Sequence, residues 1–145
     1  MKVLAIDDQK LVLIPLANRL KELGYEVLTE TSALKGIETY NSFQPDLVIV
    51  DINMPKISGM EVVKHIRNTK NEATPIMVLS GNTDDDMITK GFDLGINDYM
   101  KKPLSLVEVC ARIKRLIGAP KTLNTTKTYN NVMIQQRCVG VVIPC

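Results

Sequence analysis

The sequence predicts a doubly wound α/β domain built on a five-stranded parallel sheet. Three short apolar runs are continuous rather than alternating, which is typical of parallel strands buried on both faces. Amphipathic stretches separate these runs, so strands and helices alternate along the chain. Because crossovers between parallel strands are right-handed, few topologies remain, and the strand order 2-1-3-4-5 is common for five strands.

The first strand is predicted at residues 3–6, and a leucine-rich helix follows at residues 11–23. Gly24 closes that helix, as glycine often does. Pro15 lies inside it, and an interior proline costs a helix about 3 kcal/mol. We therefore expect a kink at Pro15 or a helix that starts late.

The second strand is predicted at residues 25–29, which alternate like an edge strand. Ser32 or Thr31 can cap the helix that then runs to about residue 43. Residues 46–51 form the second continuous apolar run and therefore the third strand.

The second half of the domain repeats this alternation. A third helix is expected at residues 60–68 and the fourth strand at residues 75–80. The acidic residues 84–86 suit the first turn of a fourth helix, because carboxylates complement the helix dipole there. Residues 96–100 form the fifth strand, and Ser105 caps a last helix that ends near residue 117.

Composition narrows the class of protein. The formal net charge of the 145 residues is +2, too close to neutral to indicate binding to nucleic acid or to a membrane surface. No apolar run approaches the length of a membrane span, and the N-terminus lacks the features of a secretory signal. The three cysteines have no metal-type spacing. We therefore expect a cytoplasmic protein with reduced thiols.

Polar side chains mark the ends of the predicted strands. Asp7 and Asp8 follow the first strand, Asp51 ends the third, Ser80 ends the fourth, and Lys102 follows the fifth. Ligands of such sheets bind beyond the carboxyl ends of the strands, so these side chains should converge. Carboxylate oxygens suit Mg²⁺, and a lysine with a hydroxyl suits a phosphate. The set favours phosphoryl transfer to a carboxylate.

Each of these features alone has a simpler explanation. An acid pair at a strand end is more often a helix cap or a solvated turn. Lys102 before Pro103, and Ser80 before Gly81, are most often plain turns. The prediction rests on their joint position at the carboxyl ends of one sheet.

These residues resemble the receiver domains of bacterial two-component response regulators, over about residues 1–118. The order and spacing of several motifs carry the resemblance. They are Asp7-Asp8, Asp51-Ile52-Asn53-Met54-Pro55 with Gly59, Ser80, and Tyr99-Met100-Lys101-Lys102-Pro103.

The resemblance implies a role for each matching position. Asp51 would accept the phosphoryl group. Asp8 would bind Mg²⁺ directly and Asp7 largely through water, while Asn53 would contribute its backbone carbonyl. Lys102, with a cis bond to the proline that follows it, would pair with the phosphoryl oxygens.

The resemblance also implies a switch. The hydroxyl of Ser80 would turn toward the phosphate and Tyr99 would swing inward. These shifts would reshape the face formed by the fourth helix, the fifth strand and the fifth helix. Implied partners are a sensor histidine kinase or small phosphodonor, an output domain or partner protein, and a second copy bound through that face. The domain would catalyse only its own phosphorylation and dephosphorylation.

The C-terminal segment differs in composition. Residues 119–137 are expected to form a linker, and residues 138–145 an apolar tail. Residues 141–145 resemble the opening strand of family 2 glycosyltransferases, which suggests a chain cut just inside an output domain. The alternative is a tail strand that packs on this domain or on a neighbouring molecule.

Other functions of the same fold class fit less well. A phosphatase of the haloacid-dehalogenase type needs a second aspartate two residues after its nucleophile, and here that residue is Asn53. A flavin or nucleotide binder needs a loop rich in Gly, Ser or Thr after the first strand, where Asp7, Asp8 and Gln9 stand instead. A receiver that acts only as a docking module is a further alternative. Such a module would not need the complete set of acid, hydroxyl and lysine.

Overall fold

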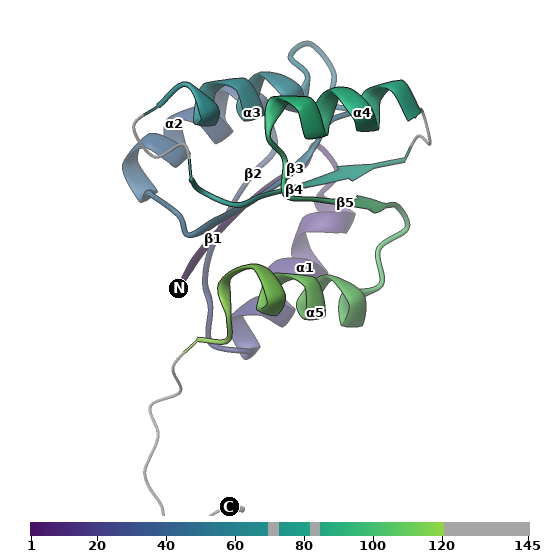
Figure 1. Ribbon diagram of the computed structural model, residues 1–145. Coiled ribbons are helices and arrows are strands. Elements are labelled where there is room, and N and C mark those ends of the chain that lie inside the picture. The colour runs from purple at the N-terminus through teal and green to yellow at the C-terminus, as the bar shows by residue number, and fades with distance from the viewer. Residues whose placement is uncertain (70–72, 82–84, 121–145) are drawn as a thin grey trace, which may run out of the picture.

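The computed structural model describes residues 1–69, 73–81 and 85–120. In this part of the chain five parallel strands form one sheet in the order β2-β1-β3-β4-β5, and helices cover both of its faces (Figure 1). The predicted α/β class and strand order are therefore confirmed. Among the described helices, none is both long and apolar enough to cross a lipid bilayer.

The elements alternate strictly along the chain. The strands are β1 (Lys2–Ile6), β2 (Glu26–Glu30), β3 (Leu47–Asp51), β4 (Ile76–Ser80) and β5 (Asp98–Lys101). The helices are α1 (Lys10–Glu22), α2 (Ala33–Phe43), α3 (Gly59–Arg67), α4 (Asp85–Leu94) and α5 (Leu106–Ile117).

The sheet separates two apolar cores. Helices α1 and α5 cover one face, and α2, α3 and α4 cover the other (Figure 1). Successive residues of a strand point to opposite faces, so Val3 packs in the first core and Leu4 in the second. Every residue of β3 and β4 is buried, which explains why their sequences are continuous apolar runs.

Serine is the N-cap residue of three of the helices, and its hydroxyl accepts a hydrogen bond from the first turn. Ser32 accepts a hydrogen bond from the backbone N–H of Lys35, and Ser105 accepts one from the N–H of Glu108, as predicted. Ser58 caps α3, so this helix begins one residue earlier than expected.

Pro15 does not delay α1, which is continuous from Lys10. Of the two expected outcomes, a kink or a late start, the late start is excluded. Leu13, Leu16 and Leu20 are buried on one side of the helix, and their packing on the sheet fixes the helix on both sides of the exposed proline. This burial offsets the cost of the missing N–H donor.

The start of β5 lies two residues later than expected, because the preceding residues close α4. The N–H of Ile96 donates to the carbonyl of Gly91 over 3.1 Å. Asn97 forms a hydrogen bond with β4, because its side-chain oxygen accepts from the backbone N–H of Ile76 at 2.9 Å. Arg67, the last residue of α3, donates to Gly95 O and to the same Asn97 oxygen. This junction ties α3, β4 and the end of α4 together.

A hydrogen bond holds the end of α5 against the end of the sheet where the strands begin. The hydroxyl of Tyr25, just before β2, donates to the carbonyl of Gly118 over 2.9 Å. Pro120 lies against Gly24 at the same edge. Most of the linker and the whole apolar tail predicted from the sequence lie outside the described residues, as does Asp84, so these predictions stay open.

Candidate functional site

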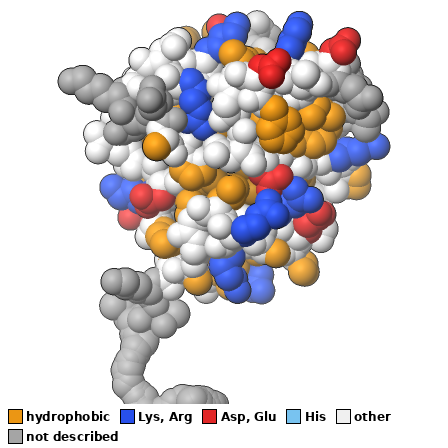
Figure 2. Space-filling model, in the orientation of Figure 1, with side chains coloured by type: hydrophobic (Ala, Val, Ile, Leu, Met, Phe, Trp, Pro, Cys, Tyr) orange, Lys and Arg blue, Asp and Glu red, His pale blue; other side chains and the backbone are white. Residues whose placement is uncertain are grey.

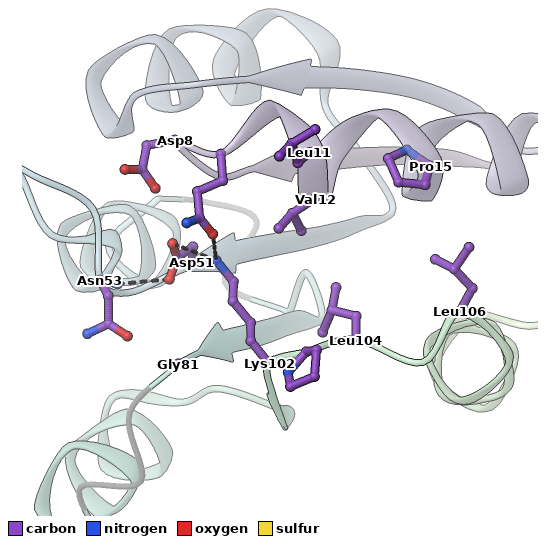
Figure 3. A pocket seen from close by; sticks show the side chains of 12 residues that line it. Asp8, Leu11, Val12, Pro15, Asp51, Asn53, Gly81, Lys102, Leu104 and Leu106 are labelled. Atoms are coloured by element: carbon purple, nitrogen blue, oxygen red, sulfur yellow. Dashed lines mark hydrogen bonds and ion pairs between the residues drawn. The ribbon is translucent and has the colours of Figure 1, made fainter.

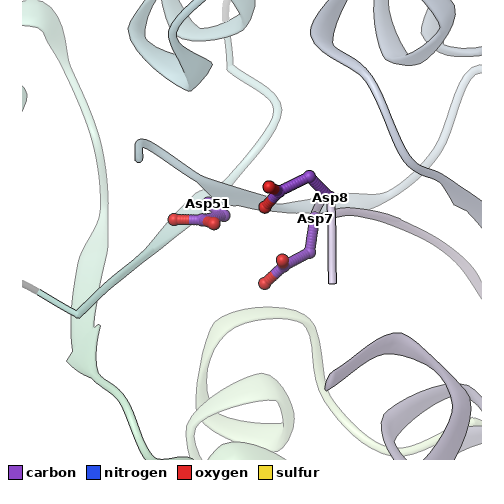
Figure 4. Close-up of side chains that lie close together, drawn as sticks. All are labelled: Asp7, Asp8 and Asp51. Atoms are coloured by element: carbon purple, nitrogen blue, oxygen red, sulfur yellow. The ribbon is translucent and has the colours of Figure 1, made fainter. Parts of the chain in front are cut away.

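Three carboxylates converge beyond the ends of two neighbouring strands. Asp7 and Asp8 follow β1, and Asp51 is the last residue of β3. One carboxylate oxygen from each lies within 4.8 Å of the other two (Figure 4). Asp7 and Asp51 are buried, whereas Asp8 is exposed, so the cluster opens toward solvent on the Asp8 side.

Lys102 reaches this cluster from the loop after β5 (Figure 3). Its ammonium nitrogen lies 2.8 Å from Asp7 Oδ2 and 3.1 Å from Asp51 Oδ2. The peptide bond from Lys102 to Pro103 is cis, as the resemblance implied. The ammonium thus contacts two of the three clustered carboxylates.

The titration of these groups follows from their surroundings. Burial raises the pKa of Asp7, and the nearby Asp51 charge raises it further, against the opposing effects of Lys102 and of the Gln9 N–H. Burial alone would lower the pKa of Lys102, but its contacts with Asp7 and Asp51 outweigh burial and raise it. Lys102 therefore carries its positive charge at neutral pH.

The cluster has the features of a site for a divalent cation. Asp7 Oδ2 is buried and accepts no aligned hydrogen bond; its contact with Lys102 is an ion pair. A buried carboxylate oxygen needs a compensating cation, and the Lys102 ammonium at 2.8 Å provides one here. Mg²⁺ prefers carboxylate and carbonyl oxygens and keeps several waters. The residues present therefore fit this ion.

Asn53 and Ser80 complete the polar site. The backbone N–H of Asn53 donates to Asp51 Oδ1 over 2.9 Å. Its side-chain oxygen accepts a hydrogen bond of 2.9 Å from the hydroxyl of Ser80, which is buried at the end of β4. Sequence reasoning assigned Asn53 only a backbone role, so this side-chain contact was missed.

Tyr99 does not lie in the acidic cluster. It is a half-buried residue of β5, and its ring packs against the core on the α2, α3 and α4 side of the sheet. The other residues predicted for the site converge, whereas Tyr99 would have to act from the neighbouring strand.

A cavity of about 930 Å³ opens beside Asp51. At one end it is polar, and at the other it is bounded by apolar side chains of α1 and of the segment around the start of α5 (Figure 3). The lining residues are Asp8, Gln9, Leu11, Val12, Pro15, Asp51, Asn53, Gly81, Lys102, Pro103, Leu104 and Leu106. Gln9 was not predicted as part of the site, although it directly follows the acid pair in the sequence.

Known protein families provide an independent comparison. The response regulator receiver domain matches residues 3–114 of the chain. The chain belongs to this family. As a receiver domain of two-component response regulators, it takes part in two-component signal transduction.

Individual relatives agree with this membership. The chain is 34% identical over 116 residues to the alkaline phosphatase synthesis transcriptional regulatory protein PhoP of Bacillus subtilis, covering 80% of this chain and 48% of PhoP. It is 35% identical over 143 residues to the transcriptional regulatory protein PrrA of Mycobacterium tuberculosis, covering 99% of this chain and 60% of PrrA. The chain thus spans about half to three fifths of the length of these relatives.

A solved structure gives the same result for the fold. The crystal structure of a putative response regulator from Chloroflexus aurantiacus is 30% identical, with a TM-score of 0.74. The match covers 80% of this chain and 96% of that one. Receiver domains of this family bind Mg²⁺ in their active site, and this receiver carries an acidic cluster.

Proposed function

We propose that this receiver is phosphorylated on Asp51 in a Mg²⁺-dependent reaction. The observation that carries the proposal is the position of Lys102, whose ammonium contacts Asp51 and Asp7 at the carboxyl ends of adjacent strands. Asp7, Asp8, Asp51 and the backbone carbonyl of Asn53 would hold the metal ion.

The transfer exchanges one bond to phosphorus for another. An oxygen of Asp51 attacks the phosphorus of a phosphohistidine or of acetyl phosphate and forms a new O–P bond. The P–N or P–O bond to the donor breaks, and histidine or acetate leaves with the bonding electron pair. Bound Mg²⁺ would neutralise part of the charge on the transferring oxygens. Lys102 supplies a further positive charge, and catalysis consists mainly of this positioning and neutralisation.

The phosphoryl group would then act as a conformational switch. The hydroxyl of Ser80 would leave Asn53 for a phosphoryl oxygen, and Tyr99 would move inward. The face formed by α4, β5 and α5 would carry the change to an output domain, a partner protein or a second copy of the receiver. The phosphodonor would be a sensor histidine kinase in the cytoplasm or a small molecule, and self-catalysed transfer and hydrolysis would be the only reactions.

We do not assign nucleic-acid binding to the receiver. On the face drawn in Figure 2, the Lys and Arg side chains of the described residues are interspersed with Asp and Glu, rather than gathered into one basic region. PhoP and PrrA are transcriptional regulators, so DNA binding would belong to a part of the protein beyond this domain.

The decisive measurement is the intact-protein mass after incubation with acetyl phosphate. We expect one phosphoryl group to be added in the presence of Mg²⁺, and none after its removal by a chelator. Asp51→Asn should abolish the adduct. Asp46→Asn is the matched control, because Asp46 precedes the same strand at its opposite end, and it should be labelled like the wild type.

A different result would change the assignment. If the wild type gained no phosphoryl group and did not respond to beryllofluoride, a docking module without phosphorylation would be the better description. Labelling that persisted in Asp51→Asn would place the acceptor elsewhere.

A further inference from the structure

Gln9 stands at the start of α1 but does not act as a capping residue. It occupies the N-cap position, where Ser, Thr, Asp or Asn usually accepts a hydrogen bond from the helix. The Gln9 side chain makes no such bond; only its backbone carbonyl does, accepting from Val12 and Leu13. The side-chain amide is therefore available for another contact.

That contact is with Lys102. The amide oxygen Oε1 of Gln9 accepts a hydrogen bond from the Lys102 ammonium over 3.0 Å. The two residues are 93 positions apart, so the bond joins the loop after β1 to the loop after β5, and both residues line the cavity.

The contact completes the surroundings of the ammonium group. A lysine ammonium has three N–H donors, and here three side chains accept from it or pair with it. Asp7 lies at 2.8 Å, Asp51 at 3.1 Å and Gln9 at 3.0 Å. The Lys102 side chain is only 15% exposed, so neighbouring groups enclose most of it, whereas Gln9 itself is exposed.

The three partners respond differently to a divalent cation. A cation bound by the acidic cluster would compete for oxygens of Asp7 and Asp51, and its charge would repel the ammonium. Gln9 is neutral and is not among the clustered carboxylates, so its hold on Lys102 would persist. It would then keep the ammonium beside the Asp51 oxygen that becomes phosphorylated.

We propose that Gln9 is a positioning residue for phosphoryl transfer, whose amide oxygen holds Lys102 in the place where it meets the phosphoryl oxygens. The inference rests on the proposed phosphorylation of Asp51. Preorganised groups contribute to catalysis because they need not be reordered during the reaction. Loss of Gln9 should therefore lower the maximal rate of phosphorylation and leave Mg²⁺ binding nearly unchanged.

Three variants distinguish this positioning role from a role of side-chain length alone and from a general effect of substitution near α1. Gln9→Met keeps the side-chain length and removes the acceptor. Gln9→Glu keeps an acceptor at the same reach. Asn18→Leu is the matched control, because it removes an amide of similar size from an exposed position of the same helix.

The rate of labelling by acetyl phosphate is measured by mass at saturating Mg²⁺ and saturating donor, and Mg²⁺ affinity by calorimetry. Losing a complete preorganised donor costs a factor of about 10² to 10³. Lys102 keeps two of its three partners in Gln9→Met, so we expect a smaller loss of about 3- to 10-fold. Gln9→Glu should recover most of the rate, and Asn18→Leu should match the wild type.

Each of the following results would contradict the proposal, and each would point to a different explanation. Wild-type maximal labelling of Gln9→Met would show that Lys102 needs no positioning by Gln9. An effect confined to Mg²⁺ affinity would assign Gln9 to the metal instead, and a Gln9→Glu rate as low as that of Gln9→Met would exclude a role for the acceptor. If the wild type itself formed no adduct, the proposed function would fall, and with it any positioning role.

Discussion

The hydroxyl of Ser80 donates a hydrogen bond to the side-chain oxygen of Asn53 over 2.9 Å. The bond joins the end of β4 to the loop that follows Asp51. Ser80 is buried, whereas Asn53 lies at the surface. Asn53 therefore holds the hydroxyl that the proposed switch requires.

Removing this acceptor should make the switched state easier to reach. A hydrogen bond of this kind contributes about 1 kcal/mol, which corresponds to about a fivefold change in an equilibrium constant. We expect Asn53→Ala to bind beryllofluoride about fivefold more tightly in the presence of Mg²⁺, since the substitution keeps the backbone carbonyl. Calorimetric titration measures this affinity. Weaker binding would show that the Asn53 side chain supports the phosphoryl site instead.

Metal affinity should depend on the exposed member of the acidic cluster. Asp8→Asn removes one of three negative charges, and we expect Mg²⁺ affinity to fall by about tenfold or more. Calorimetry suits this measurement, because the chain has no tryptophan to report binding by fluorescence. Glu22→Gln, which changes a carboxylate in an exposed pair with Arg19, is the control. Equal affinities for both variants would exclude Asp8 as a ligand.

Gly59 should tolerate no side chain. A Cβ there would overlap the backbone carbonyl of Asp51, which cannot move without displacing the end of β3. We expect Gly59→Ala to lower the free energy of unfolding by about 1–3 kcal/mol or more, measured by denaturant unfolding. Gly81→Ala is the matched control, because none of the described residues other than its chain neighbours lies within 4 Å of the added carbon. A stable Gly59→Ala variant would show that the start of α3 can shift away from β3.

Arg67 should contribute more to stability than an ordinary surface arginine. Its guanidinium donates to the carbonyls of Gly95 and Thr74 and to the side chain of Asn97. Arg67→Met leaves these acceptors without the charged donor, and we expect a loss of about 2–3 kcal/mol in urea unfolding.

Arg19→Met provides the comparison for Arg67. The Arg19 pair with Glu22 is at least half exposed on both sides, so its loss should cost at most about 0.5 kcal/mol. Equal losses for the two variants would mean that the junction of α3, β4 and α4 is held by packing alone.

The sequence was most informative where structure is local. Continuous apolar runs predicted β3 and β4 because both faces of these strands are covered, and the hydroxyls of Ser32 and Ser105 predicted two helix starts because a cap acts within three residues. The sequence also predicted that the acids would converge with Ser80 and Lys102, because parallel strands place their carboxyl ends at one edge of the sheet.

Contacts between distant loops were not predictable in this way. Gln9 meets Lys102 across 93 residues, and Ser80 meets Asn53 across 27. Asp98 is a similar case: its burial inside β5 breaks the strand pattern, and Arg112 and Arg115 compensate its charge from α5. Periodicity describes single elements, so it carries no information on which side chains meet between them.

The bond between Tyr25 and Gly118 has a consequence for signal output. It fixes the departing chain at the edge of the sheet where the strands begin, while Asp51 lies where β3 ends. A strand of five residues spans roughly 15 Å. In the proposed function, an output domain attached after Pro120 would therefore start at the opposite end of the sheet from Asp51, and the conformational change would have to reach it through the helices that flank the sheet.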